Sequence, residues 1–180
     1  MTRGHEENFN YIKSLADIHN CDHLIIVSHK TNSSKNPLKP KVKLNYLKQI
    51  FPNLNFVLAS RKRPTLYQFL EEISKLKYET VFIASGSDRV EDFKKIRQYN
   101  GRLFHFKNML PVSTGNRGLV GAHNTISGTK QRQRVVLNDF IGFIRGCPSC
   151  MSIELMEKLF KELRKVAMSS RRKSPRNRSL

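Results

Sequence analysis

Hydrophobic residues up to residue 107 alternate between two patterns, one with helical spacing and one typical of buried strands. The stretch 5–19 carries Phe9, Ile12 and Leu15 at helical spacing, and the continuous apolar run HLIIVS (23–28) follows it. A short run rich in branched apolar residues predicts a strand that is buried on both faces. The same reasoning predicts helices over 42–51, 65–77 and 90–100, and strands over 55–60, 80–85 and 102–107.

Strands separated by helices of this length favour parallel pairing with right-handed crossovers. We therefore expect an α/β fold, a three-layer Rossmann-like parallel sheet with helices on both faces. After residue 107 the sequence is typical of a loop through GNRGLVGAHNTISG, and helical spacing returns near 129–145 and again over 152–168.

This pattern predicts three parts in the chain. We expect an α/β domain over 1–145, a C-terminal helix packed on it over 146–168, and a tail over 169–180. The tail is almost entirely polar and basic, so that it has little to bury and is expected to be disordered.

The bulk properties of the sequence narrow the class of protein. A chain of 180 residues can form one domain with a core, and it has no apolar run long enough to cross a membrane. It also shows no charged-then-apolar signal at its start. The three cysteines are an odd number without the spacing of a disulfide framework, which favours a reducing compartment. We expect a cytoplasmic protein, in the host cytoplasm if it is viral.

The charge of the chain predicts an anionic partner. The formal net charge is +19, and the last twelve residues contribute five basic side chains and no acidic one. An excess of this size fits nucleic acid or nucleotide phosphates. Charge alone does not separate a nucleic-acid binder from an enzyme that handles triphosphates.

Three short motifs lie where an α/β sheet binds its ligands, beyond the carboxyl ends of the strands and at helix N-termini. They are Gly4-His5 before the first helix, SGSDR (85–89) after a strand, and ISGTKQR (126–132) at the start of a late helix. Helix N-termini offer free N–H groups and the positive end of a dipole, which suit phosphate. The hydroxyls of Ser127 and Thr129 and the guanidinium of Arg132 can add to such a site.

Each motif also has a plain structural interpretation. A Ser or Thr at a helix start is most often an N-cap, and Asp88 after a strand is more often a helix cap than a ligand contact. A histidine such as His5 near the end of a chain usually lies on the surface. CPSC (147–150) is a lone CxxC without a second pair, which favours a structural role over a metal site.

Taken in order, the three motifs resemble the nucleotidyltransferase superfamily that carries the HxGH signature. TRGH (2–5) is similar to its [HT]-x-G-H, with Thr2 and His5 in the two signature places. GSD (86–88) is similar to its Gly-x-Asp, and SGTKQR (127–132) to its S-[ST]-T-x-x-R, with a glycine in place of the second hydroxyl. The phrases around the motifs are similar to small phage-encoded, cytidylyltransferase-like members. The resemblance covers about residues 2–145.

The resemblance implies transfer of a nucleoside monophosphate from ATP or CTP to a small phosphorylated acceptor, with release of pyrophosphate. Mg²⁺ would accompany the triphosphate, and no metal site on the protein itself is implied. The residues implied are His5, Thr2 and Arg132 for catalysis, Gly4, Gly86, Asp88, Ser127 and Thr129 for binding the nucleotide, and, more weakly, Lys43 for the phosphate of the acceptor.

The chain departs from the family pattern before its first motif. The full signature reads G-x-F-x-P-x-[HT]-x-G-H, and its first part ends a central strand between the strands expected here at 23–28 and 80–85. That strand has no counterpart in the sequence. Either the reading frame is longer than the sequence, which we favour because the later motifs have stayed together, or the chain is a decayed enzyme.

One alternative from another class stays open: a catalytically inactive, basic protein on the same scaffold, either nucleic-acid-binding or virion-associated. Non-specific contact of the basic tail with nucleic acid fits either alternative. No residue in the sequence separates ATP from CTP or identifies the acceptor.

Overall fold

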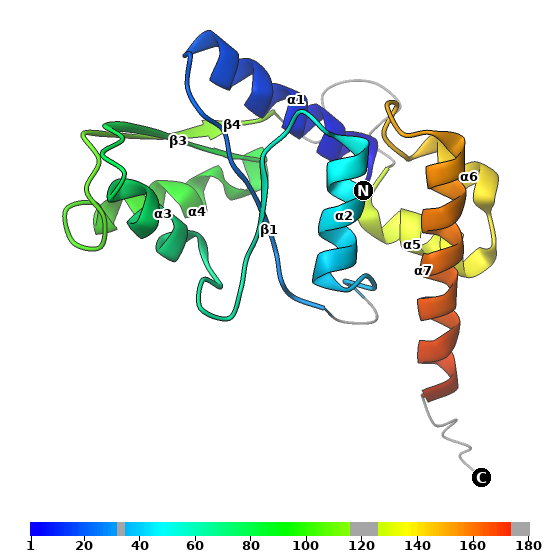
Figure 1. Ribbon diagram of the computed structural model, residues 1–180. Helices are drawn as coiled ribbons and strands as arrows, with labels where there is room; N and C mark the ends of the chain where they lie inside the picture. The colour runs from blue at the N-terminus through cyan, green and yellow to red at the C-terminus, as the bar shows by residue number, and fades with distance from the viewer. Residues whose placement is uncertain (32–34, 116–125, 174–180) are drawn as a thin grey trace. The chain divides into compact units, whose positions relative to one another are not determined.

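The computed structural model describes residues 1–31, 35–115 and 126–173 (Figure 1). It is a mixed α/β protein in which helices separate short parallel strands, as the hydrophobic pattern predicted. The helices are α1 (Arg3–Ile18), α2 (Pro40–Ile50), α3 (Leu66–Ser74), α4 (Val90–Ile96), α5 (Gly128–Leu137), α6 (Phe140–Arg145) and α7 (Ile153–Lys173). The strands are β1 (Ile25–Val27), β2 (Phe56–Leu58), β3 (Thr80–Ser85) and β4 (Asn108–Ser113).

The chain divides into two compact units. The first unit comprises Met1–Glu6, Lys30–Asn53 and Thr125–Leu180, and the second comprises Glu7–His29 and Leu54–Asn124. The first turn of α1 thus belongs to the first unit, together with α2, α5, α6 and α7. The expected domain from 1 to 145 and the separate helix over 146–168 stay predictions.

All four strands lie in the second unit, where they pair in two separate sheets. β1 pairs with β2 in parallel, with Ile25 opposite Phe56, and β3 pairs with β4 in parallel, with Thr80 opposite Asn108. Within the described part of the chain, no ladder joins β1 to β3. A single Rossmann-like sheet is therefore not confirmed.

The fourth strand lies one segment later than predicted. The prediction of a strand over 102–107 and of a loop after it is wrong, because the strand is Asn108–Ser113. The alternating side chains of 102–107 belong to a turn closed by Asn100, whose amide donates to the carbonyl of Phe106 at 2.8 Å and accepts from its N–H at 2.9 Å. The turn needs Gly101, which has a φ of 88°. A side-chain amide thus satisfies backbone groups that a strand ladder would otherwise take.

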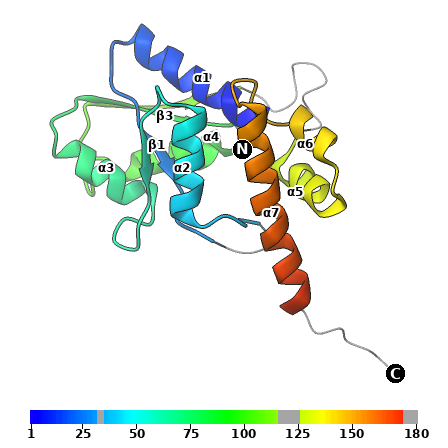
Figure 2. The same cartoon turned by 45° about the vertical axis from the view of Figure 1, so that its right-hand side comes forward.

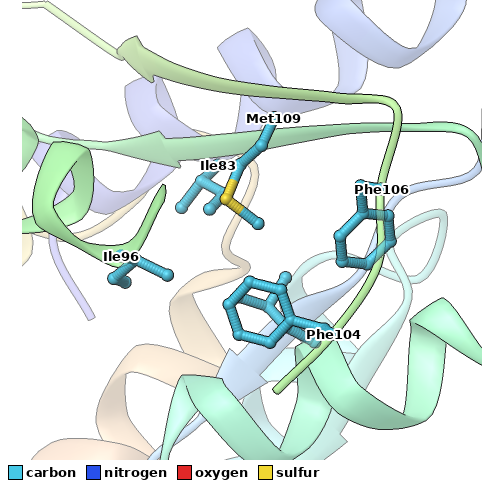
Figure 3. Close-up of a cluster of buried hydrophobic side chains, with 6 residues drawn as sticks. Ile83, Ile96, Phe104, Phe106 and Met109 are labelled. Atoms are coloured by element: carbon cyan, nitrogen blue, oxygen red, sulfur yellow. The ribbon is translucent and has the colours of Figure 1, made fainter. Parts of the chain in front are cut away.

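This turn carries aromatic side chains into the core of the second unit. Phe104 is fully buried, and Figure 3 shows it with Phe106, Ile83, Ile96 and Met109 gathered around the same point. The core therefore lies between the β3–β4 pair, α3, α4 and the turn. It holds β3, and with it the motif that follows β3, in place.

The first unit is a packing of helices. α5, α6 and α7 contact one another (Figures 1 and 2). Phe160 of α7 receives the edges of Phe140 and Phe143 at centroid distances of 5.1 and 5.2 Å. The phenol of Tyr46 on α2 donates to the carboxylate of Glu162 on α7 at 2.8 Å. None of the helices in the described ranges is long and apolar enough to cross a membrane.

Two predicted helices in this unit have different ends. The helix expected over 129–145 is two helices, because Asn138 adopts a left-handed conformation with a φ of 62° and ends α5. Asp139 then caps α6 by accepting from the N–H of Gly142 at 2.8 Å. α7 continues past the expected end at 168 to Lys173, so the prediction of a disordered tail from residue 169 is wrong as far as 173. Residues 174–180 of that predicted tail lie outside the described residues.

Candidate phosphate-binding site

The first turn of α1 holds two of the predicted catalytic residues side by side. Thr2 is 4% exposed, and a hydrogen bond of 2.8 Å joins its Oγ1 to Nδ1 of His5. The carbonyl of Thr2 also accepts from the N–H groups of His5 and Glu6. Gly4 lies in the same turn, where a Cβ would be 3.9 Å from Oγ1 of Thr2, an ordinary contact. Thr2 thus begins the helix and orients the exposed imidazole of His5.

The turn 146–150 clamps this first turn of α1. The N–H of Arg3 donates to the carbonyl of Gly146 at 3.2 Å. The carboxylate of Glu6 accepts from the N–H of Ser149 at 2.9 Å, from its hydroxyl at 2.7 Å and from the N–H of Cys150 at 3.3 Å. Burial acts to raise the pKa of Glu6, but these hydrogen bonds outweigh it and hold the pKa below its usual value. Sequence reasoning missed the clamp.

The first turn of α5 brings together the three residues of the late motif. Oγ of Ser127 accepts from the N–H of Lys130 at 3.2 Å, so Ser127 is the N-cap that the plain interpretation predicted. Nη2 of Arg132 donates to Oγ1 of Thr129 at 2.9 Å. A Cβ on Gly128 would lie 3.2 Å from Nη1 of Arg132. The guanidinium therefore folds back over the N-terminus of the helix, where free N–H groups suit an anion.

A buried glutamine connects α5 to the clamp. Gln131 is 6% exposed, and its Nε2 donates to the carbonyl of Phe143 at 2.8 Å. A Cβ on Gly146 would lie 2.7 Å from the amide of Gln131, so the absence of a side chain at Gly146 allows this contact. Gly146 is also the residue that accepts from Arg3. The first turns of α1 and α5 are thus tied to the same short segment.

Two cations act on the amino group of Met1. The pKa of the Met1 amino group is lowered, first by burial and then, against the opposing effect of Cys147, by the charges of Arg132 and Lys43. Both cations therefore lie close enough to act on the same group. Burial also lowers the pKa of Lys43, which lies on α2. Thr2 and His5 are thus joined by a hydrogen bond, and Arg132 and Lys43, from two other parts of the sequence, lie in the same compact unit.

Gly86 and Asp88 belong to the second unit and are considered apart from this group. Gly86 follows β3 directly, and its carbonyl accepts from the N–H of Arg89 at 2.9 Å. Asp88 lies within the short 3₁₀ helix Ser87–Arg89, and its side chain is outside what the structure describes, so the predicted cap stays a prediction. The predicted place of this motif, at the carboxyl end of a strand, is confirmed.

The CPSC turn does not present reactive thiolates. Cys147 is 1% exposed, and burial raises the pKa of its thiol to about 11. Burial, together with the neighbouring carboxylate of Glu6, raises the pKa of Cys150. Metals and electrophiles react with the thiolate form. Across the described ranges, no group of three or more His, Cys, Asp or Glu side chains is arranged to hold a metal ion.

Comparisons with known proteins give no match: no family model, no curated protein and no solved structure matches the chain.

Proposed function

We propose that the chain is a nucleotidyltransferase that moves a nucleoside monophosphate from ATP or CTP to a small phosphorylated acceptor. The observation that carries the proposal is that His5 lies in the first turn of α1, Lys43 in the first turn of α2 and Arg132 over the N-terminus of α5, all in one compact unit. Two helix N-termini and three nitrogen-bearing side chains suit a ligand with several phosphates.

In the proposed reaction, a phosphate oxygen of the acceptor attacks the α-phosphorus of the triphosphate. The new P–O bond forms as the bond between the α-phosphorus and the bridging oxygen breaks, and the electron pair leaves with pyrophosphate. Catalysis then consists of positioning and of neutralising the charge that builds up on the phosphates. No covalent intermediate with the protein is required.

We assign the residues the roles that the family resemblance implies. His5, oriented by Thr2, donates to the α-phosphate, and the N-terminus of α1 beside Gly4 adds its dipole. Ser127, Thr129 and Arg132 hold the β- and γ-phosphates at the N-terminus of α5. We assign Lys43 to the phosphate of the acceptor, and Gly86 and Asp88 to the nucleoside or the acceptor.

Mg²⁺ would enter bound to the oxygens of the triphosphate. The described side chains include no group of ligands that fits a resident metal ion, so no step is assigned to one.

Pyrophosphate release from ATP and from CTP, measured with a panel of small phosphorylated acceptors, tests the proposal. We expect His5→Asn and Arg132→Gln to lower kcat by about a hundredfold or more, the size typical for removing one donor to a transition-state anion. His105→Asn and Arg102→Gln are matched controls, because both residues are exposed and lie in the second unit. The controls should stay within about twofold of the wild type.

Absence of pyrophosphate release with every acceptor, or equal losses in the site variants and the controls, would overturn the proposal. In either case the alternative of a basic binding protein on the same scaffold becomes the better description.

A further inference from the structure

The charges on α7 are divided along its length. Its acidic residues are Glu154, Glu157 and Glu162, and after Glu162 the described helix contains only basic ionisable residues. Two of these acids are engaged: Glu157 pairs with Lys161 at 3.2 Å, and Glu162 accepts from a tyrosine of α2. The second half of the helix therefore has no carboxylate of its own to balance its cations.

One face of α7 is already used for packing. Met156, Leu159 and Phe160 are buried, with exposed fractions of 8%, 1% and 5%, and they follow the three- and four-residue spacing of one helix face. Figure 2 shows this helix alongside α5 and α6, which it contacts. The apolar face is thus occupied within the first unit.

Basic residues follow the opposite face at the same spacing. Lys158, Lys161 and Lys165 lie three and four positions apart, which places them on one face of the helix. Lys158, Lys161 and Lys165 are exposed, and for Lys158 and Lys165 no ion pair with another described residue is found. Arg164 is half-buried and its Nη1 is buried, so it does not belong to this exposed face.

We propose that this basic face of α7 binds the phosphate backbone of nucleic acid. From Lys158 to Lys165 the helix rises about 10 Å, at about 1.5 Å per residue. B-DNA carries one negative charge for about every 1.7 Å of its axis, so a face of this length can meet several phosphates. The binding is independent of sequence, because the interaction is with the backbone and not with base edges.

The occupation of the apolar face favours nucleic acid over a lipid surface. A helix that binds to a membrane lays its apolar face into the acyl boundary. In α7 that face packs inside the protein, and its basic face is what remains for a partner. The proposal does not depend on the transferase activity, since the basic face of α7 shares no residue with the proposed catalytic group.

The test measures binding of the full chain to fluorescently labelled single-stranded and duplex DNA and RNA by anisotropy, between about 50 and 200 mM salt. The test variant replaces Lys158, Lys161 and Lys165 by glutamine. The control variant replaces Lys62, Lys94 and Lys95 of the second unit by glutamine. These lysines are also exposed, so that both variants lose the same charge. Lys94 pairs with Glu91 much as Lys161 pairs with Glu157, which matches the two sets further.

We expect the test variant to lose at least about tenfold in affinity at low salt, and its log–log salt slope to become shallower by about two to three, one unit for each lost phosphate contact. The control should change affinity by less than about twofold. Equal losses in both variants would mean general charge attraction and would overturn the proposal. Vesicles with anionic lipid that compete as well as nucleic acid at equal phosphate concentration would also overturn it.

Discussion

Replacement of Glu6 by glutamine tests whether the clamp positions the first turn of α1. Glu6 is the residue next to His5, and its carboxylate accepts from three donors in the turn 146–150. Glutamine keeps the size of the side chain and one acceptor oxygen, but it removes the charge and one of the two oxygens. The substitution therefore weakens the clamp without leaving a cavity.

The expected loss is about 1 kcal/mol of unfolding free energy. Hydrogen bonds to a charged group contribute about 1.5–3 kcal/mol where they are well buried. Glu6 is only half-buried, so water screens its charge and the lower part of the range, reduced further, applies. For a chain of this size, about 1 kcal/mol corresponds to a fall in Tm of about 2–4 °C.

The dependence on pH distinguishes this cause from a general loss of charge. The folded pKa of Glu6 lies below the ordinary value of 4.5, because the folded state stabilises the carboxylate. Its contribution to stability is therefore complete above the unfolded pKa and is lost as the pH falls through the folded pKa. The difference in Tm between the wild type and Glu6→Gln should be full at neutral pH and should shrink below the unfolded value.

Glu7→Gln is the matched control. Glu7 is exposed, is the next residue of the same helix, and has the same charge to lose. Thermal unfolding of the three proteins, followed by circular dichroism from neutral to acidic pH, gives the comparison. If Glu6→Gln lowers Tm no more than Glu7→Gln, or if its deficit persists unchanged in acid, the clamp does not carry the energy assigned to it.

Substitutions at Phe104 and Asn138, each with a control, test the packing and the backbone by denaturant unfolding. Phe104→Ala should lower the free energy of unfolding by about 3–5 kcal/mol, because the ring is fully buried. The control Leu103→Ala, at a side chain that is 49% exposed, should lower it by less than about 1 kcal/mol. Similar losses at both positions would contradict the assigned core. Asn138→Gly should leave stability within a few tenths of a kcal/mol, and Asn138→Ala should cost about 1 kcal/mol, because the residue ends α5 with a φ of 62°. An alanine variant as stable as the glycine variant would show that this conformation is not required.

The strands were predictable to the extent that each was a continuous apolar run. TVFIAS (80–85) is such a run and is β3 residue for residue. NMLPVS (108–113) begins with a polar residue and contains Pro111, both of which argue against a strand in the sequence. A proline is nevertheless tolerated in β4 because this strand has a single partner in the described sheet. The preceding LFHF alternation was misleading, since Asn100 satisfies the backbone there.

The candidate site was predictable where its residues are neighbours in the sequence. Thr2 and His5, and Thr129 and Arg132, lie one helical turn apart, so helical spacing alone brings each pair together. Glu6 and Ser149 are separated by 143 positions, and only the tertiary approach of α1 to the turn 146–150 joins them. An acidic residue in the first turn of a helix is already explained by its favourable interaction with the helix dipole. The sequence therefore gave no separate signal for the role of Glu6 in the clamp.

The division of the strands into two pairs bears on how the first turn of α1 is held. The family resemblance places a strand between β1 and β3 that has no counterpart in this sequence. The pairing of the strands, a separate observation, is interrupted between the same two strands. In the described structure, the bonds of Arg3 and Glu6 to the turn 146–150 are what anchor that first turn. Because Glu6 is next to His5 and bonds to the turn 146–150, Glu6→Gln should lower the proposed transferase rate as well as stability.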